Sequence, residues 1–313
     1  MGFDTSHHPV DEALVDRALA YLLEGQPLDD LVADAVRVAK VRFRANAWGL
    51  GVLDVEGETG LQSDLHIWGR PFFITADEGI GAVIDRYLAA TPEGVDVIAR
   101  EQLALLDPAL AERVTPDMEG TLPDDADLAA EVLGTLDVLR TAWAGVDANT
   151  PVELPGGDRV PARELLQRDL PFAVLRFAAS LRPGWMDRGY VWPTNLLIEA
   201  DVPEAVIAFA SPTRLVGAAA NHPELELFAP PTITENYMVG GYVDAARVPG
   251  VRQAVETHRE TLEATYDDDG AEPVIPMRTS VKKLREALAD AEERGMAFCE
   301  ATEVYSGFAG VMN

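Results

Sequence analysis

Apolar residues recur at helical spacing through most of the chain. The clearest case is the segment 12–24, which follows Asp11 and ends before Gly25. Glycine closes helices because it enters the left-handed conformation without a Cβ clash. The same spacing predicts further helices over the segments 27–41, 77–90, 94–106, 126–144 and 162–181.

Short strands are predicted around these helices. Residues 2–6 favour a first strand, and the Gly-Gly pair within 151–161 is typical of a hairpin. After the second helix, glycines are expected to divide the chain into strand-like pieces at Gly49, Gly51, Gly57 and Gly60.

The C-terminal pattern is strand, helix, helix, strand. The strands are predicted at 237–243 and 296–305, and the helices at 245–266 and 278–294. We expect the two strands to lie beside each other in one sheet, closed by the two helices. The chain as a whole is therefore predicted to be an α+β protein, mostly helical with short strands.

Residues 115–125 are the best candidate for a domain boundary, because they combine two prolines, a glycine and several carboxylates. They would separate an N-terminal helical lobe with short strands, 1–114, from a C-terminal α+β lobe, 126–313. A single compact domain is the alternative, because the sequence contains no long flexible linker.

Composition and charge exclude several classes of protein. The chain has 313 residues and is 48% hydrophobic, which is too apolar for a disordered chain. Its formal net charge of −28 argues against nucleic-acid binding, because that binding depends on neutralising phosphates with cations. The acidity has two interpretations: a surface adapted to a high-salt cytoplasm, or a surface evolved to meet a basic protein.

The sequence favours a cytoplasmic protein with no membrane partner. Residues 1–30 lack the cationic start and apolar run of an export signal, and no apolar stretch is long enough to cross a membrane. The single cysteine, Cys299, excludes a disulfide framework. Its apolar neighbours favour a buried strand thiol over a nucleophile.

The N-terminal histidines are candidate metal ligands. Phe3–Pro9 resembles the first-strand motif of TIM-barrel metal-dependent hydrolases, in which Asp-Thr-His-x-His ends a strand, although Ser6 replaces the first histidine of that motif. The resemblance implies a metal site, for which Asp4, His8 and His66 are the ligands to test. Alternatively, His7 and His8 end a strand and help to cap the next helix.

Other chemical motifs are missing from the sequence. It contains no G-x-S-x-G nucleophile elbow, no P-loop and no complete dinucleotide fingerprint. The cofactor is therefore unknown. The basic run 37–44 is the only segment that would favour an anion, and pairing with the protein's own carboxylates is the stronger interpretation.

Aromatic and charged residues concentrate in three segments, 67–71, 182–195 and 232–242. Prolines and glycines in 182–195 predict an irregular loop, in which rings beside arginines are suited to binding flat or anionic groups. The alternative is that these rings only attach the loop to the core. Across the three segments, the candidate ligand-binding residues are Arg182, Trp185, Arg188, Tyr190, Trp192, Trp68, Arg70, Asn236 and Tyr237.

Three functional hypotheses follow. The first is an acidic binding protein, such as an immunity- or inhibitor-type partner of a basic protein, because Trp, Tyr and Arg dominate interface hot spots. The second is a hydrolase in which Glu235 or Asp187 acts as the acid/base. The third is a metal-binding protein that uses the N-terminal histidine pair. The sequence does not indicate an oligomeric state.

Overall fold

The computed structural model divides into two compact units. The first comprises Met1–Asp29 and Leu133–Glu303, and the second comprises Asp30–Val132 and Val304–Asn313. The lobes 1–114 and 126–313 stay a prediction. The residues that the structure describes are 4–59, 72–76, 78–117, 124–182, 185–188, 197, 200–203, 212–225, 239–264 and 277–302.

A four-stranded antiparallel sheet forms the centre of the first unit. Its strands lie in the order β4-β1-β6-β5. The pairing of β5 with β6 confirms the side-by-side arrangement predicted for the two C-terminal strands. Their bounds are β1 Asp4–Val10, β4 Trp185–Arg188, β5 Val239–Val243 and β6 Ala297–Thr302.

Helices connect β5 to β6, which confirms the predicted strand–helix–helix–strand unit. The first predicted helix is interrupted at His258, whose backbone leaves the helical conformation. The connecting helices are η1 Ala245–Arg247, α11 Val248–Thr257, α12 Arg259–Ala264 and α13 Met277–Arg294. The mostly helical α+β class is therefore confirmed.

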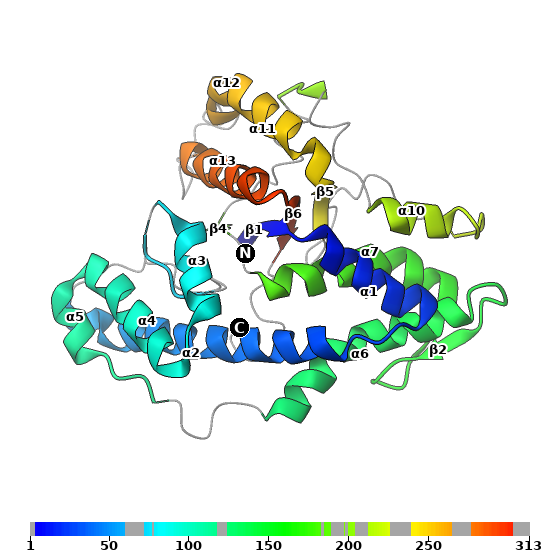
Figure 1. Ribbon diagram of the computed structural model, residues 1–313, viewed down its shortest axis with the longest axis horizontal. Helices are drawn as coiled ribbons and strands as arrows, with labels where there is room; N and C mark the ends of the chain where they lie inside the picture. The colour runs from blue at the N-terminus through cyan, green and yellow to red at the C-terminus, as the bar shows by residue number, and fades with distance from the viewer. Residues whose placement is uncertain are drawn as a thin grey trace. The chain divides into compact units, whose positions relative to one another are not determined.

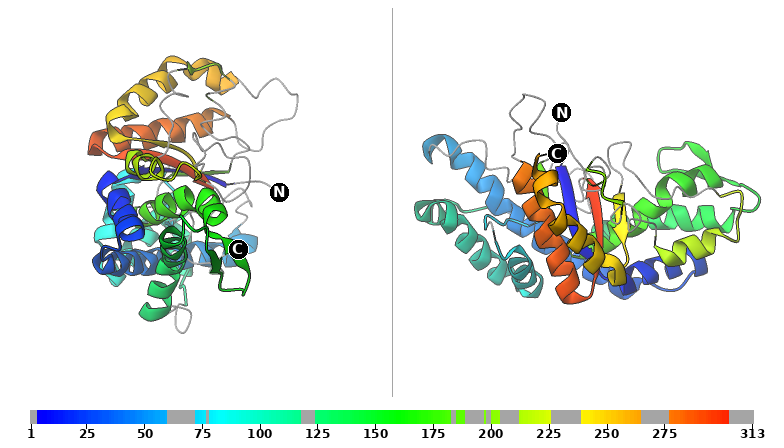
Figure 2. Two further views of the ribbon diagram at one scale, coloured as in Figure 1. Left: turned by 90° about the vertical axis from the view of Figure 1, so that its right-hand side faces the viewer. Right: turned by 90° about the horizontal axis from the view of Figure 1, so that it is seen from above.

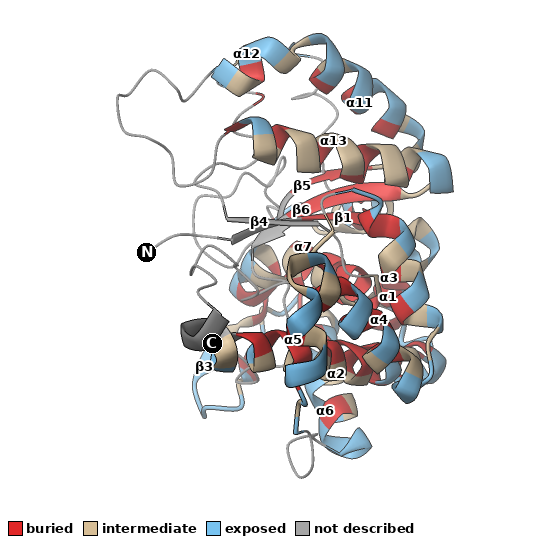
Figure 3. Cartoon of the chain, turned by 90° about the vertical axis from the view of Figure 1, so that its left-hand side faces the viewer, coloured by how far each residue is buried: buried red, intermediate tan, exposed pale blue. Residues whose placement is uncertain are grey.

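The sheet is covered on both faces (Figures 1 and 2). Helix α13 packs on one face, with α11 and α12 outside it, and α7 (Ala162–Leu181) packs on the other, with α1 (Glu12–Glu24) against it. Figure 3 shows that α13 carries buried residues along its length and that most of its other residues are only partly exposed, because α11 and α12 cover its outer side. Because α7 has neighbours on several sides, it carries buried residues around its circumference, such as Leu166, Val174 and Leu175.

The N-terminal histidines lie within β1, because the strand extends from Asp4 to Val10 and does not end at residue 6. Both rings are buried, and His8 pairs in register with the buried Cys299. Helix α1 is capped instead by Asp11, whose side chain accepts a hydrogen bond from the backbone of Ala13 at 2.8 Å. The prediction that the histidines end the strand and cap the helix is therefore wrong.

Cys299 is the buried strand thiol that the sequence predicts. Burial raises the pKa of this thiol, and the charge of the neighbouring Glu300 raises it further. A thiol held in its neutral form is a poor nucleophile, so the structure supports a packing role for Cys299.

The rest of the first unit consists of α6 (Asp125–Ala144, which starts in the second unit), β2 (Pro151–Glu153), β3 (Arg159–Pro161) and α10 (Thr213–Ala219). Strands β2 and β3 form the predicted hairpin. Its turn requires glycine at Gly157, where φ is +86°.

The second unit contains α2 (Asp29–Thr59), α3 (Ile80–Ala89), α4 (Pro92–Leu106), α5 (Pro108–Arg113) and the start of α6. The predicted division at the glycines after residue 41 is wrong, because α2 continues to Thr59. Its buried face extends through Ala45, Trp48 and Val52, and this tertiary packing outweighs the low helix propensity of glycine.

The basic run on α2 pairs with the protein's own carboxylates, as predicted. Arg37 pairs with Asp34, Lys40 with Asp125, and the Arg44 guanidinium forms two hydrogen bonds with Asp96, at 2.7 and 2.9 Å. These pairs leave no clear anion site in the described part of the run.

Ionisation of Tyr21 is expected to lower the stability of the folded protein at alkaline pH. Its hydroxyl donates a hydrogen bond to Asp137, and burial together with this bond raises the pKa of Tyr21 to about 12 from 10.0. Because the folded state holds this proton more tightly, its stabilising effect is complete below pH 10.0 and is lost as the pH rises towards about 12. Urea unfolding between pH 9 and pH 12 should show a smaller loss of stability in Tyr21→Phe than in the wild type. Equal losses in the two proteins would contradict this assignment.

Candidate metal centre

Four of the residues predicted for the ligand-binding and catalytic sites are described by the structure, and all four come from the segment 182–188. Trp185, Asp187 and Arg188 lie in β4, so the predicted irregular loop is wrong for 185–188. This segment becomes a strand because it pairs with β1, which places Trp185 opposite His7 and Arg188 opposite Asp4.

Arg182 lies just before this strand, at the end of α7. It forms an ion pair with Asp290 of α13 at 3.3 Å, and both side chains are largely buried. This contact links two elements of the same unit. Asp4 and His8, two of the predicted metal ligands, lie in β1. The remaining residues predicted for the ligand, catalytic and metal sites lie outside the described residues: His66, Trp68, Arg70, Tyr190, Trp192, Glu235, Asn236 and Tyr237.

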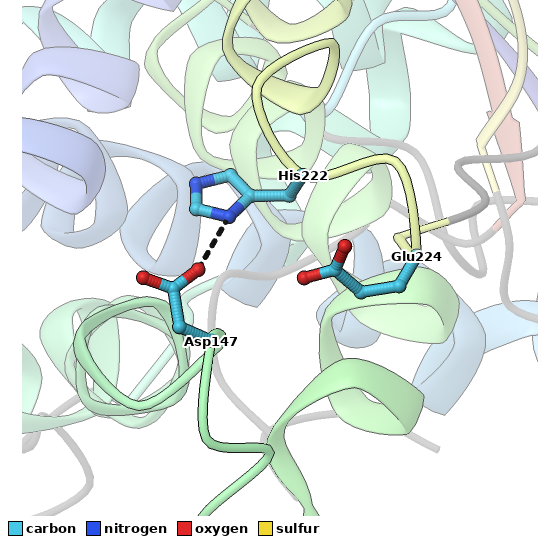
Figure 4. A group of neighbouring side chains, drawn as sticks. All are labelled: Asp147, His222 and Glu224. Carbon is cyan, nitrogen blue, oxygen red and sulfur yellow. Dashed lines mark hydrogen bonds and ion pairs between the residues drawn. The ribbon is translucent and has the colours of Figure 1, made fainter.

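A different cluster unites three side chains with metal-binding atoms (Figure 4). Asp147 follows α6, whereas His222 and Glu224 follow α10, and one ligand atom from each lies within 4.8 Å of the others. Nδ1 of His222 lies 3.0 Å from Oδ1 of Asp147. In the described part of the chain, no other group of three such residues is this close.

Backbone hydrogen bonds fix the loop that carries Asp147. The amide of Val146 donates to Trp143, and the amide of Thr150 donates to Gly145, so the chain turns tightly after α6. Val146 is buried and anchors the turn, while the Asp147 carboxylate is 87% exposed. The turn therefore presents this carboxylate to solvent from a fixed backbone.

The second loop holds His222 in a similar way. Its amide donates to Ala219 at 2.9 Å, and its carbonyl accepts from the amide of the buried Leu225 at 2.8 Å. The ring is packed edge-on against Trp143, with 4.8 Å between the ring centroids. Because the carboxylate of Asp147 only accepts hydrogen bonds, Nδ1 of a metal-free His222 carries the proton between them.

Arg163, near the start of α7, forms hydrogen bonds with both loops. Its Nε donates to the carbonyl of Val146 at 3.0 Å, and its Nη2 donates to the carbonyl of Asp147 at 2.7 Å. The same Nη2 lies 3.2 Å from Oε1 of Glu224. Its backbone amide also donates to the Asn149 side chain at 3.0 Å.

This cluster was not predicted from the sequence. Asp147 and His222 are 75 residues apart, so only the fold brings them together. A local signal did exist, since His222-Pro223-Glu224 places two ligand types in one turn after a helix. The predicted metal ligand His8 is buried within β1, away from solvent.

Two further findings concern the class of protein. Among the described residues, no helix is long and apolar enough to cross a membrane. No protein-family model matches the chain, and neither the curated proteins nor the solved structures provide a match.

Proposed function

We propose that the protein binds a divalent metal ion of the zinc type through Asp147, His222 and Glu224. The observation that supports this most strongly is the convergence of one imidazole nitrogen and two carboxylates within 4.8 Å. Zinc accepts this mixed set of nitrogen and oxygen ligands, and catalytic zinc sites use three protein ligands. The metal-binding hypothesis is thereby moved from the N-terminal histidines to this cluster.

The geometry fits a shared ion. Metal–ligand bonds of about 2.0–2.2 Å place two ligands of one ion roughly 3 Å apart. Asp147 and His222 already have this spacing, at 3.0 Å. The Glu224 carboxylate has to approach them, and its side chain is 35% exposed, so solvent rather than packed core surrounds much of it.

The contact between Arg163 and Glu224 does not prevent this movement. Both side chains are about one-third exposed. Ion pairs of this kind contribute only about 0–1 kcal/mol. The overall charge of −28 favours metal binding, because it raises the concentration of cations near the protein surface.

The test is a calorimetric titration of the metal-free protein with Zn²⁺. We expect one ion per chain at this site. Asp147→Asn should weaken binding strongly, whereas Asp158→Asn, which changes an exposed carboxylate in the hairpin turn, should not. Equal affinities in these two variants would refute the assignment.

A second candidate function is binding of a basic protein. Cations along the described chain form ion pairs with the protein's own carboxylates, from Arg37 with Asp34 to Arg294 with Asp290. Carboxylates remain in large excess over these cations, which supports binding of a basic partner. Purification from the native lysate should recover a stoichiometric basic partner that high salt releases. Recovery of none at moderate salt would count against this function. The hydrolase hypothesis based on Asp187 and Glu235 stays a prediction.

A further inference from the structure

The proposed metal centre has an open side. Three protein ligands leave at least one coordination position for another molecule. The Asp147 carboxylate is 87% exposed, so this position faces solvent and is not enclosed by the core. An ion held here would therefore bind water or an external ligand.

Arg163 offers hydrogen-bond donors beside this position. Its Nε and Nη2 hold the carbonyls of Val146 and Asp147 and so fix the plane of the guanidinium. Its Nη1 makes no hydrogen bond within the described residues. A donor group that is oriented but not saturated is suited to binding an oxygen-rich ligand.

The charge at the site changes sign when the metal binds. The two carboxylates and Arg163 together leave one net negative charge, since a ligating histidine is neutral. A divalent ion turns this into one net positive charge, on a chain whose overall charge is −28. The loaded site therefore attracts anions that the metal-free protein repels.

We infer that the loaded centre binds a ligand with a phosphate group, held by the metal ion and by Arg163. This inference rests on the proposed metal binding. The tetrahedral oxygens of a phosphate can bind the ion and the guanidinium at the same time, and arginine is well suited to phosphate recognition.

The experiment uses the full chain loaded with Co²⁺, whose visible absorption reports changes in its ligands. Adding inorganic phosphate should change the spectrum saturably, and calorimetry should detect no phosphate binding to the metal-free protein. Arg163→Gln should weaken phosphate binding by about tenfold or more, because a charge-assisted hydrogen bond is lost. Arg168→Gln, on the same helix and paired with Asp169, is the matched control and should bind as the wild type does.

The outcomes separate the two proposals. If Co²⁺ does not bind, the proposed metal site fails. If Co²⁺ binds and phosphate leaves the spectrum unchanged, the phosphate inference alone is overturned. Because Arg163→Gln also removes bonds to the Asp147 loop, its Co²⁺ affinity is measured first. The comparison of loaded and metal-free wild type does not depend on any variant.

Discussion

Replacing His222 with Ala is expected to lower the affinity for Zn²⁺ by about 100-fold or more, because it removes the only nitrogen ligand of the cluster. The two remaining carboxylates would hold zinc weakly, since solvent reaches both and Glu224 is paired with Arg163. Calorimetric titration of the variant and the wild type measures this difference.

His258→Ala is the control for this variant. His258 lies at the break between α11 and α12 and is not one of the three clustered residues, so its removal should leave zinc affinity unchanged. The wild type should also bind zinc more weakly as the pH falls, because protons compete for the ligands. If His222→Ala bound zinc as tightly as His258→Ala did, the cluster would not be the metal site.

Gly51→Ala is expected to destabilise the second unit by about 1–3 kcal/mol, as overpacking of a close contact usually does. A Cβ at this position would lie 2.4 Å from Cγ1 of Val114. The gain in helix propensity, about 1 kcal/mol, opposes this cost but is smaller than a clash at that distance. Urea unfolding of both proteins measures the net effect.

Val114→Ala tests the cause. It removes Cγ1 and leaves the Val114 Cβ, 3.7 Å from the new methyl group, at ordinary contact distance. In this background Gly51→Ala should be neutral or stabilising, which a double-mutant cycle detects. Gly134→Ala, with no atom within 4 Å of its new Cβ, should stabilise the chain and provides the control. A Gly51→Ala that stabilised the wild type would show that Val114 is not in close contact.

Local signals made much of the fold predictable. Helix α1 ends at Gly25, where φ is +71°, because the sequence supplies the residue that this cap requires. The hairpin at 151–161 follows from its Gly-Gly turn. The pairing of β5 with β6 was predictable because two short strands flank two helices that can cover one sheet face.

Long-range contacts explain the failures. The glycines of α2 suggest breaks in the sequence, but the burial of Ala45, Trp48 and Val52 favours a continuous helix, and Gly51 leaves room for Val114. Residues 185–188 read as a loop, but pairing with β1 makes them a strand. The cluster of Asp147, His222 and Glu224 depends on two loops that only the tertiary fold brings together.

The most direct test of metal binding is the position of the ion itself. Crystals of the full chain grown with Zn²⁺ would be measured at the zinc absorption edge, and the anomalous difference map would locate the metal. We expect a peak about 2.0–2.2 Å from a carboxylate oxygen of Asp147, a ring nitrogen of His222 and a carboxylate oxygen of Glu224. A map with zinc bound elsewhere, and no peak among these three side chains, would contradict the proposed centre.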